Sequence, residues 1–228
     1  MKRAILALVG AAVLAGCGAS PHGEGNASVW ITRDRGEHVV LVRKVPAGIT
    51  AMDALQRVAD VDTRYGGRFV QSIDGVSGSL SKKRDWFYFV NGYEADRGAA
   101  DYKLHDGDVE WWDYRSWKTS MHVPIVVGAF PEPFRHGYDG KTRKATVVFT
   151  SAELQDEAEA LGKIIGAKRV DADELDNVNV LFLTRADVPL SATTDGPGKP
   201  VRFVLGPTAA RRLLSDRKLV RYRYTGLR

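Results

Sequence analysis

The chain has 228 residues, of which 44% are hydrophobic and 27% are charged, and its formal net charge is +5. This length can supply either one large hydrophobic core or two small ones. The charge falls to +3 if Lys2 and Arg3 leave with the N-terminal segment discussed next, and so mild a balance argues against nucleic acid as a partner.

The N-terminal segment has the three parts of a secretory signal: a positively charged start, an apolar run at residues 4–14, and small residues after it. The run is too short to span a bilayer as a helix. It ends in Leu-Ala-Gly-Cys at residues 14–17, which resembles the lipobox of bacterial lipoproteins. This resemblance implies that residues 1–16 are removed and that Cys17 carries the lipid, palmitate being one such acyl group. The alternative is an ordinary signal cleaved near Ala19.

Cys17 is the single cysteine of the sequence, so a disulfide within the chain and a zinc site built on several thiolates are both excluded. A lone cysteine in an exported protein needs a chemical use, and lipidation supplies one. We therefore expect the protein to be held at the extracytoplasmic face of the cell membrane through its lipid anchor. Residues 17–27, which are small and polar, are expected to be the tether.

A first domain is expected at residues 28–117. Strands at 28–33 and 38–45 flank a polar turn, and a helix follows in which Thr50 is the expected N-cap. Turn signals of the type Asp-Gly and Asn-Gly then separate three further strands. These three are expected at residues 68–73, 85–90 and 108–117. The order β-β-α-β-β-β favours a β-grasp, in which a mixed sheet curls over one helix.

Within this domain a set of motifs stands in one order: GITAMDAL at 48–55, WFYFVNGY at 86–93, GA at 98–99, LHDGD at 104–108 and WDY at 112–114. This set is similar to the transcobalamin C-terminal-like family, a β-grasp domain of bacterial surface proteins. The family is related to the C-terminal domain of the vitamin B12 carriers. The resemblance implies the fold, and it makes a corrinoid one candidate ligand. The carriers, however, hold their ligand against a helical barrel that this sequence does not contain.

A second, α/β domain is expected at residues 123–228, after a bridge at 118–122, because all five tryptophans precede this point. Helices are expected at 151–165, ended by Gly166, and at 207–216. Apolar runs indicate five strands. They lie at residues 124–129, 145–150, 178–183, 201–205 and 219–224. The whole chain is thus predicted to be α+β, with a β-grasp domain followed by a small α/β domain.

Large aromatic side chains occupy both faces of the expected sheet, because residues alternate along each strand. One face can pack on the single helix, and the other needs a partner. That partner is either the second domain or a ligand, since aromatic walls commonly line binding pockets. The candidate ligand or interface residues are Trp86, Tyr88, Tyr93, Trp111 and Trp117.

Catalytic motifs are missing from the sequence: it has no G-x-S-x-G elbow, no H-E-x-x-H pair and no glycine-rich phosphate loop. Asp106 and Asp108 are explained by a polar turn, so no metal or cofactor is expected. The sequence therefore predicts a non-enzymatic surface lipoprotein that binds or presents a ligand, with a small molecule or an envelope protein as its partner. The alternative is a structural or interaction module that docks an envelope protein such as a membrane permease.

Overall fold

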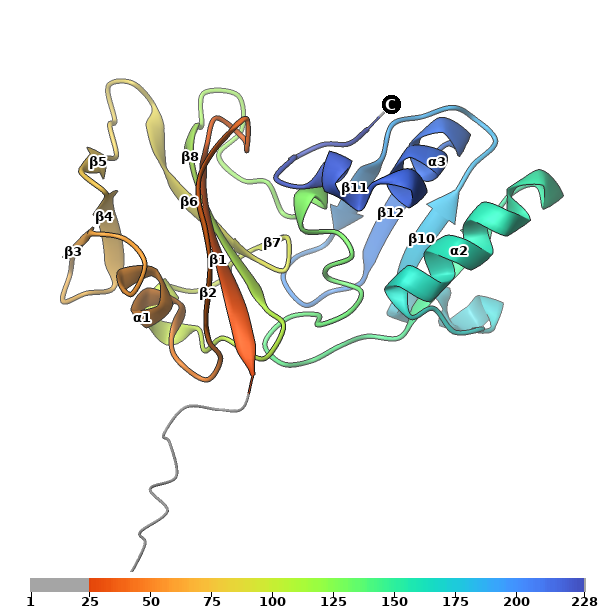
Figure 1. Ribbon diagram of the computed structural model, residues 1–228, viewed down its shortest axis with the longest axis horizontal. Helices are drawn as coiled ribbons and strands as arrows, with labels where there is room; N and C mark the ends of the chain where they lie inside the picture. Colours follow the sequence, from red (N-terminus) through yellow and green to blue (C-terminus); the bar gives the residue numbers. More distant parts are fainter. Residues whose placement is uncertain (1–24, 228) are drawn as a thin grey trace, which may run out of the picture.

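The computed structural model describes residues 25–227. The expected signal segment, Cys17 and most of the expected tether lie outside this part. Helices and strands both contribute to the fold, which is α+β. Two units lie side by side along the long axis of the molecule (Figure 1). Within residues 25–227, no helix combines the length and hydrophobicity needed to cross a bilayer.

The first unit is built on a five-stranded mixed sheet in the order β2-β1-β8-β6-β7. Its central strands, β1 (Asn26–Arg33) and β8 (Val109–Ser116), are parallel to each other. β2 (His38–Pro46) pairs antiparallel with β1, and β6 (Arg84–Val90) pairs antiparallel with β8. β7 (Tyr93–Glu94) completes the sheet beyond β6.

One face of this sheet is covered by α1 (Ala51–Gln56) and by a small three-stranded sheet, both on the left in Figure 1. The small sheet is formed by β3 (Val61–Arg64), β4 (Phe69–Ile73) and β5 (Val76–Ser77). The predicted cap of α1 is confirmed, because Thr50 Oγ1 accepts a hydrogen bond from the Asp53 amide at 3.0 Å. A 3-10 turn, η1 (Ala99–Asp101), precedes β8.

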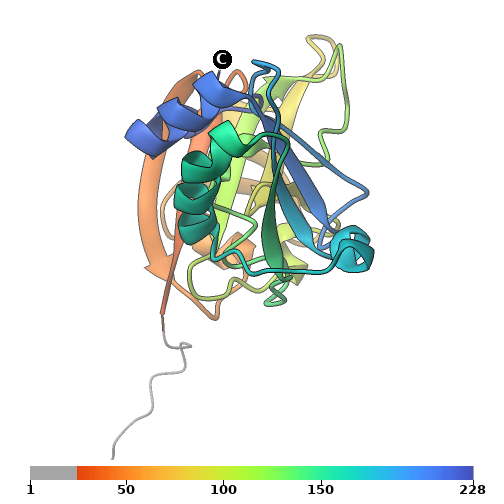
Figure 2. The same cartoon turned by 90° about the vertical axis from the view of Figure 1, so that its right-hand side faces the viewer.

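The second unit contains a four-stranded sheet in the order β11-β12-β10-β9. Three strands are parallel: β9 (Ala145–Phe149), β10 (Asn179–Leu183) and β12 (Val201–Leu205). β11 (Ser191–Thr194) is an antiparallel edge strand. The helices α2 (Gln155–Ile165) and α3 (Pro207–Ser215) lie on the same side of this sheet (Figure 2). Short 3-10 helices complete the unit: η2 (Val127–Ala129), η3 (Ala152–Leu154), η4 (Ala172–Asn177) and η5 (Arg217–Val220).

Two predicted strands are wrong. Residues 124–129 form η2 and a single bridge from Ile125 to Tyr93, and residues 219–224 contain the end of η5 followed by a turn. Each run contains side chains that are buried against the first unit: Val126 is fully buried, Tyr224 is 5% exposed, and both belong to the cluster around Trp111. Burial without a neighbouring strand gives the same short hydrophobic signal as a strand.

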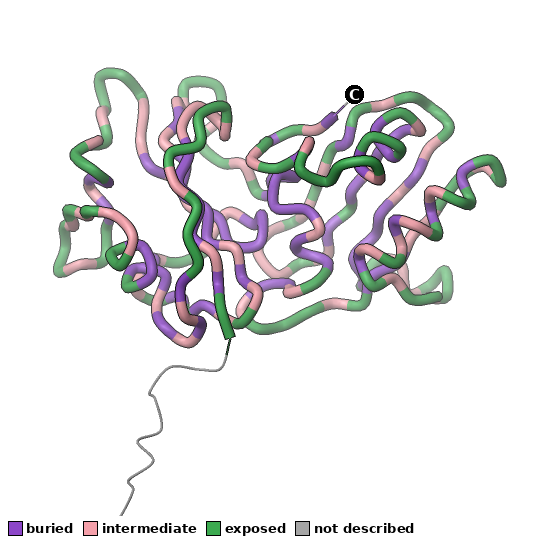
Figure 3. Tube along the Cα trace, viewed as in Figure 1, coloured by how far each residue is buried: buried purple, intermediate pink, exposed green. Residues whose placement is uncertain are grey.

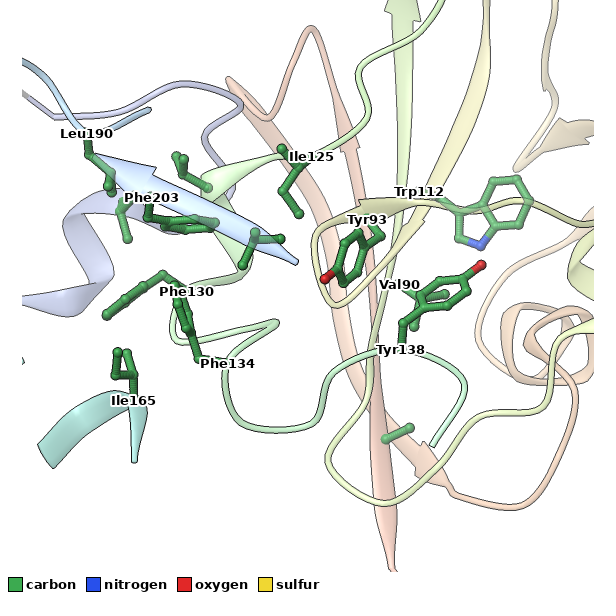
Figure 4. Packing of buried hydrophobic residues seen from close by; sticks show 14 of the residues in the cluster. Val90, Tyr93, Trp112, Ile125, Phe130, Phe134, Tyr138, Ile165, Leu190 and Phe203 are labelled. Atoms are coloured by element: carbon green, nitrogen blue, oxygen red, sulfur yellow. The ribbon is translucent and has the colours of Figure 1, made fainter. Parts of the chain in front are cut away.

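The two units share a buried core. Side chains from the linking segment, among them Ile125, Phe130 and Phe134, join Tyr93 of the first unit to Phe203 of the second (Figure 4). The burial colouring shows the same continuity, with buried chain on both sides of the junction (Figure 3). The expected boundary at 118–122 lies in a largely exposed stretch next to this core.

Candidate functional site

Two of the predicted aromatic residues lie on the α1 face of the first sheet. The Trp86 indole donates a hydrogen bond to the Val76 carbonyl at 2.7 Å, and its ring lies 5.3 Å from that of Tyr114. The Tyr88 ring stacks on Trp112 at 4.8 Å, and its hydroxyl donates to the Arg97 carbonyl at 2.6 Å. Burial raises the pKa of Tyr88 well above its ordinary value. Both side chains therefore serve internal packing on this face.

The opposite face of the first sheet is covered by the second unit. Trp111 is completely buried, and its ring lies 5.6–5.9 Å from the rings of Trp30, Phe89 and Tyr224. Tyr224 belongs to the C-terminal segment, which crosses this face together with Val126. Trp111 thus lies at an interface inside the molecule.

The remaining two candidates lie elsewhere. Tyr93 is at the junction of the units, where its hydroxyl donates to the Lys199 carbonyl at 2.6 Å and burial raises its pKa well above the ordinary value. Trp117 is half-buried beyond the end of β8, with the Lys83 ammonium 5.9 Å from its ring centre. The five predicted residues therefore do not line one common cavity in the described structure.

Buried polar groups reinforce the interface around Trp111. The Asp113 carboxylate accepts hydrogen bonds from the Thr32 hydroxyl at 2.6 Å, the Tyr224 hydroxyl at 2.9 Å and the Gly36 amide at 3.2 Å. Burial raises the pKa of Asp113, although these hydrogen bonds oppose the shift. The Trp111 indole donates to the same Thr32 hydroxyl at 2.8 Å. This network links the C-terminal segment to β8 through the hydrogen bond from Tyr224 to Asp113.

Glu110 is a second buried carboxyl, on the α1 side of β8. One of its oxygens accepts a hydrogen bond from the Trp112 indole at 2.6 Å, whereas the other has no partner among the described residues. Complete burial raises the pKa of Glu110 well above its ordinary value. This carboxyl is fully buried and is a feature of the core.

A large cavity lies in the second unit, and we call it the β9 groove. It has a volume of about 820 Å³ and runs between α2 and the segment 168–175, with β9 at its base. Figure 2 views this side of the molecule, where α2 lies on one side of β9 and η4 on the other. Its apolar lining includes Val147, Phe149, Ala158, Val170 and Leu175. A volume of this size fits an ordinary ligand site.

Three cations line the β9 groove: Lys163 on α2, and Lys168 and Arg169 just after it. Glu159 is the acidic side chain of the lining, and it accepts a hydrogen bond from Gln155 at 2.9 Å. The groove is therefore apolar at its base and positively charged at its rim. This arrangement can bind an anionic ligand or partner.

Sequence reasoning did not find the β9 groove, because its residues form no motif. The available signal was Gly162, a glycine inside a predicted helix, one turn after Ala158 and next to Lys163. A glycine in a helix interior costs stability, so its presence indicates a packing or functional reason. The structure shows this reason, because Gly162 on α2 lines the groove together with β9.

Comparison with known proteins gives a family match over part of the chain. Residues 48–116 match the model of a domain of unknown function, DUF4430. The matched segment begins just before α1 and ends with the last residue of β8. No curated protein matches the sequence.

Among solved structures, a protein of Ruminococcus gnavus ATCC 29149 described as a candidate metal-binding protein is similar at 18% identity and a TM-score of 0.35. The similarity covers 41% of this chain and 98% of that protein. Among residues 25–227 of this chain, no three His, Cys, Asp or Glu side chains are grouped so that they could hold a metal ion.

Proposed function

We propose that this protein is a lipid-anchored binding protein of the extracytoplasmic face, without catalytic activity, whose ligand site is the β9 groove. The observation that carries the site is the groove itself: about 820 Å³, with an apolar base and three cations at the rim. The anchor rests on the lipobox-like sequence ending at Cys17. Nucleic acid is not among the proposed partners.

The first unit serves in this proposal as a β-grasp scaffold of the transcobalamin C-terminal-like type. Support comes from its sheet order, in which the first and last long strands, β1 and β8, pair in parallel at the centre while α1 covers one face. The motifs at residues 86–93 and 104–114 support the same assignment. Because the aromatic faces of this unit pack inside the molecule, we place the ligand site on the second unit.

The second candidate function is an interaction module that docks an envelope protein. Its support is the open edge of β9 inside the groove, since unpaired strand edges are common sites of protein association. In both cases the groove is the binding surface. The two readings differ in whether the occupant is a small molecule or a polypeptide.

The test is thermal unfolding of the full-length protein in detergent against a library of anionic metabolites, corrinoids and peptides. A ligand present at 100 times its dissociation constant stabilises the folded state by about 2.7 kcal/mol. The Gly162→Leu variant fills the groove, and Asp156→Leu places the same side chain on the exposed first turn of α2, outside it. We expect ligands that stabilise the native protein and Asp156→Leu but not Gly162→Leu. Stabilisation of all three proteins alike, or of none, contradicts the proposed site.

A further inference from the structure

β9 has one free edge, and its backbone groups face the β9 groove. Among the described strands, it pairs with β10 alone. Even-numbered residues bond toward β10: the Lys144 carbonyl accepts from the Asn179 amide at 2.9 Å, and the Thr150 amide donates to the Leu183 carbonyl at 3.1 Å. Because bonding direction alternates along a strand, Val147 directs its amide and carbonyl to the other side.

The chain itself uses only the beginning of this edge. The Lys168 amide donates to the Ala145 carbonyl at 2.7 Å, after which the segment turns away toward η4. On the groove side, the backbone groups of Val147 and Phe149 have no backbone partner among the described residues. Lys168 thus starts a strand-like pairing that stops after one hydrogen bond and leaves the rest of the edge open.

The helix beside this edge presents small residues to the groove. Ala158 and Gly162 face the groove from α2. Even a Cβ atom placed on Gly162 would have only ordinary van der Waals contacts, 3.5 Å from the side chains of Ala167 and Val147. Larger residues at these two positions would occupy the space above the free backbone groups. The small side chains therefore keep the edge accessible.

The charges around the edge favour an acidic occupant. The groove lining contains three cations, Lys163, Lys168 and Arg169, and one carboxylate, that of Glu159. The neighbouring cavity of about 420 Å³, which shares Lys168, adds further cations. These are Arg135 and Arg143. The acidic side chains of η4 are not part of the groove lining, and Glu174 pairs with Lys144 at 3.1 Å.

We propose that an extended polypeptide segment with acidic side chains adds to the free edge of β9 as a fifth strand of the second sheet. Backbone hydrogen bonds to Val147 and Phe149 would provide affinity, and the cations of the groove would select the acidic side chains. This inference rests on the proposed function and names the partner class of the same site. Pairing of two copies of this chain through β9 is disfavoured, because it would bring their groove cations together.

The experiment uses the full-length protein in detergent and a fluorescein-labelled ten-residue peptide of alternating valine and glutamate. Binding is followed by fluorescence anisotropy at low salt. Two comparison peptides are used: one has lysine in place of glutamate, and the other is N-methylated along its centre, so it cannot donate backbone hydrogen bonds. The groove variant is Lys163→Glu, Lys168→Glu and Arg169→Glu combined. Its control carries the same charge change at exposed cations of the first unit: Arg43→Glu, Lys44→Glu and Lys82→Glu.

We expect the glutamate peptide to bind the native protein and the control variant. For the groove variant, the dissociation constant of the glutamate peptide should rise at least tenfold, and this variant should bind the lysine peptide more tightly than the glutamate peptide. Gly162→Leu and N-methylation should each abolish binding. Equal binding of the N-methylated peptide, or unchanged binding by Gly162→Leu, overturns the proposal.

The results distinguish a wrong strand-addition proposal from a wrong assignment of the β9 groove as the binding site. If no peptide binds but a library ligand still separates native protein from Gly162→Leu, strand addition is wrong and the proposed function stands. If neither peptides nor library ligands make that distinction, both are wrong. Sedimentation that shows a dimer dissociated by Gly162→Leu would assign the edge to a second copy and overturn the acidic partner.

Discussion

Replacement of Trp111 with alanine should destabilise the fold, because this side chain is completely buried between β8 and the C-terminal segment. Truncation of a buried tryptophan to alanine typically costs about 3–5 kcal/mol. For a chain of this size, each 1 kcal/mol lowers the melting temperature by about 2–4 °C, so a drop of roughly 6–20 °C is expected. The Trp111→Phe variant keeps an aromatic ring and loses the hydrogen bond to Thr32, which adds about 1 kcal/mol to its packing cost.

Calorimetry and urea unfolding measure both variants, with Trp117→Ala as the matched control. Trp117 is half-buried and its ring faces the Lys83 ammonium, so its loss should cost less than about 1 kcal/mol. A Trp111→Ala protein that unfolds like the native one would refute the buried interface. If that variant also lost affinity for a ligand, the aromatic face would be a binding surface after all.

Cys17→Ser should prevent incorporation of radiolabelled palmitate and leave the precursor unprocessed; equal labelling of both proteins would remove the anchor from the proposal. Limited proteolysis should cut within residues 118–122, which are largely exposed, and the two fragments should coelute on a sizing column because they share a buried core. Gly162→Ala should raise stability by about 0.5–1 kcal/mol in urea unfolding, since α2 gains helix propensity without a close contact. Burial raises the pKa of Glu110, so the folded state holds this proton more tightly than the unfolded state. The resulting stabilisation is complete below the ordinary glutamate pKa and is lost as the pH rises through the raised pKa. Glu110→Gln should therefore give a flatter profile of melting temperature against pH.

Elements with a strong repeating pattern could be predicted from the sequence. The N-cap at Thr50, the end of α2 at Gly166 and the long strands of the first sheet follow from local signals. Short apolar runs such as residues 124–129 were wrongly predicted to be strands, because burial against the other unit gives the same hydrophobic signal as a strand. The short edge strand β11 was missed because its four residues, Ser191–Thr194, carry no large apolar side chain.

The candidate site could not be predicted from the sequence, for a different reason. Aromatic rings on both faces of the first sheet indicate that both faces are covered. The alternation of side chains along a strand, however, does not show whether the cover is another domain or a ligand. In the structure, Tyr224 and Val126 provide the cover. The β9 groove arises from an unpaired edge beside a helix with Gly162 at its centre. An unpaired edge is a property of sheet topology, and topology depends on which strands meet in the folded chain.

The family match and the proposed site occupy different parts of the molecule. The match ends at residue 116, whereas the groove begins at Thr146. In this proposal the matched segment acts as a scaffold, to which the second unit is fixed by the shared core and by the hydrogen bond from Tyr224 to Asp113. The binding chemistry then belongs to residues that the family model does not include. Proteins that share the first unit but carry a different second unit should therefore differ in ligand, even where the segment 48–116 is closely similar.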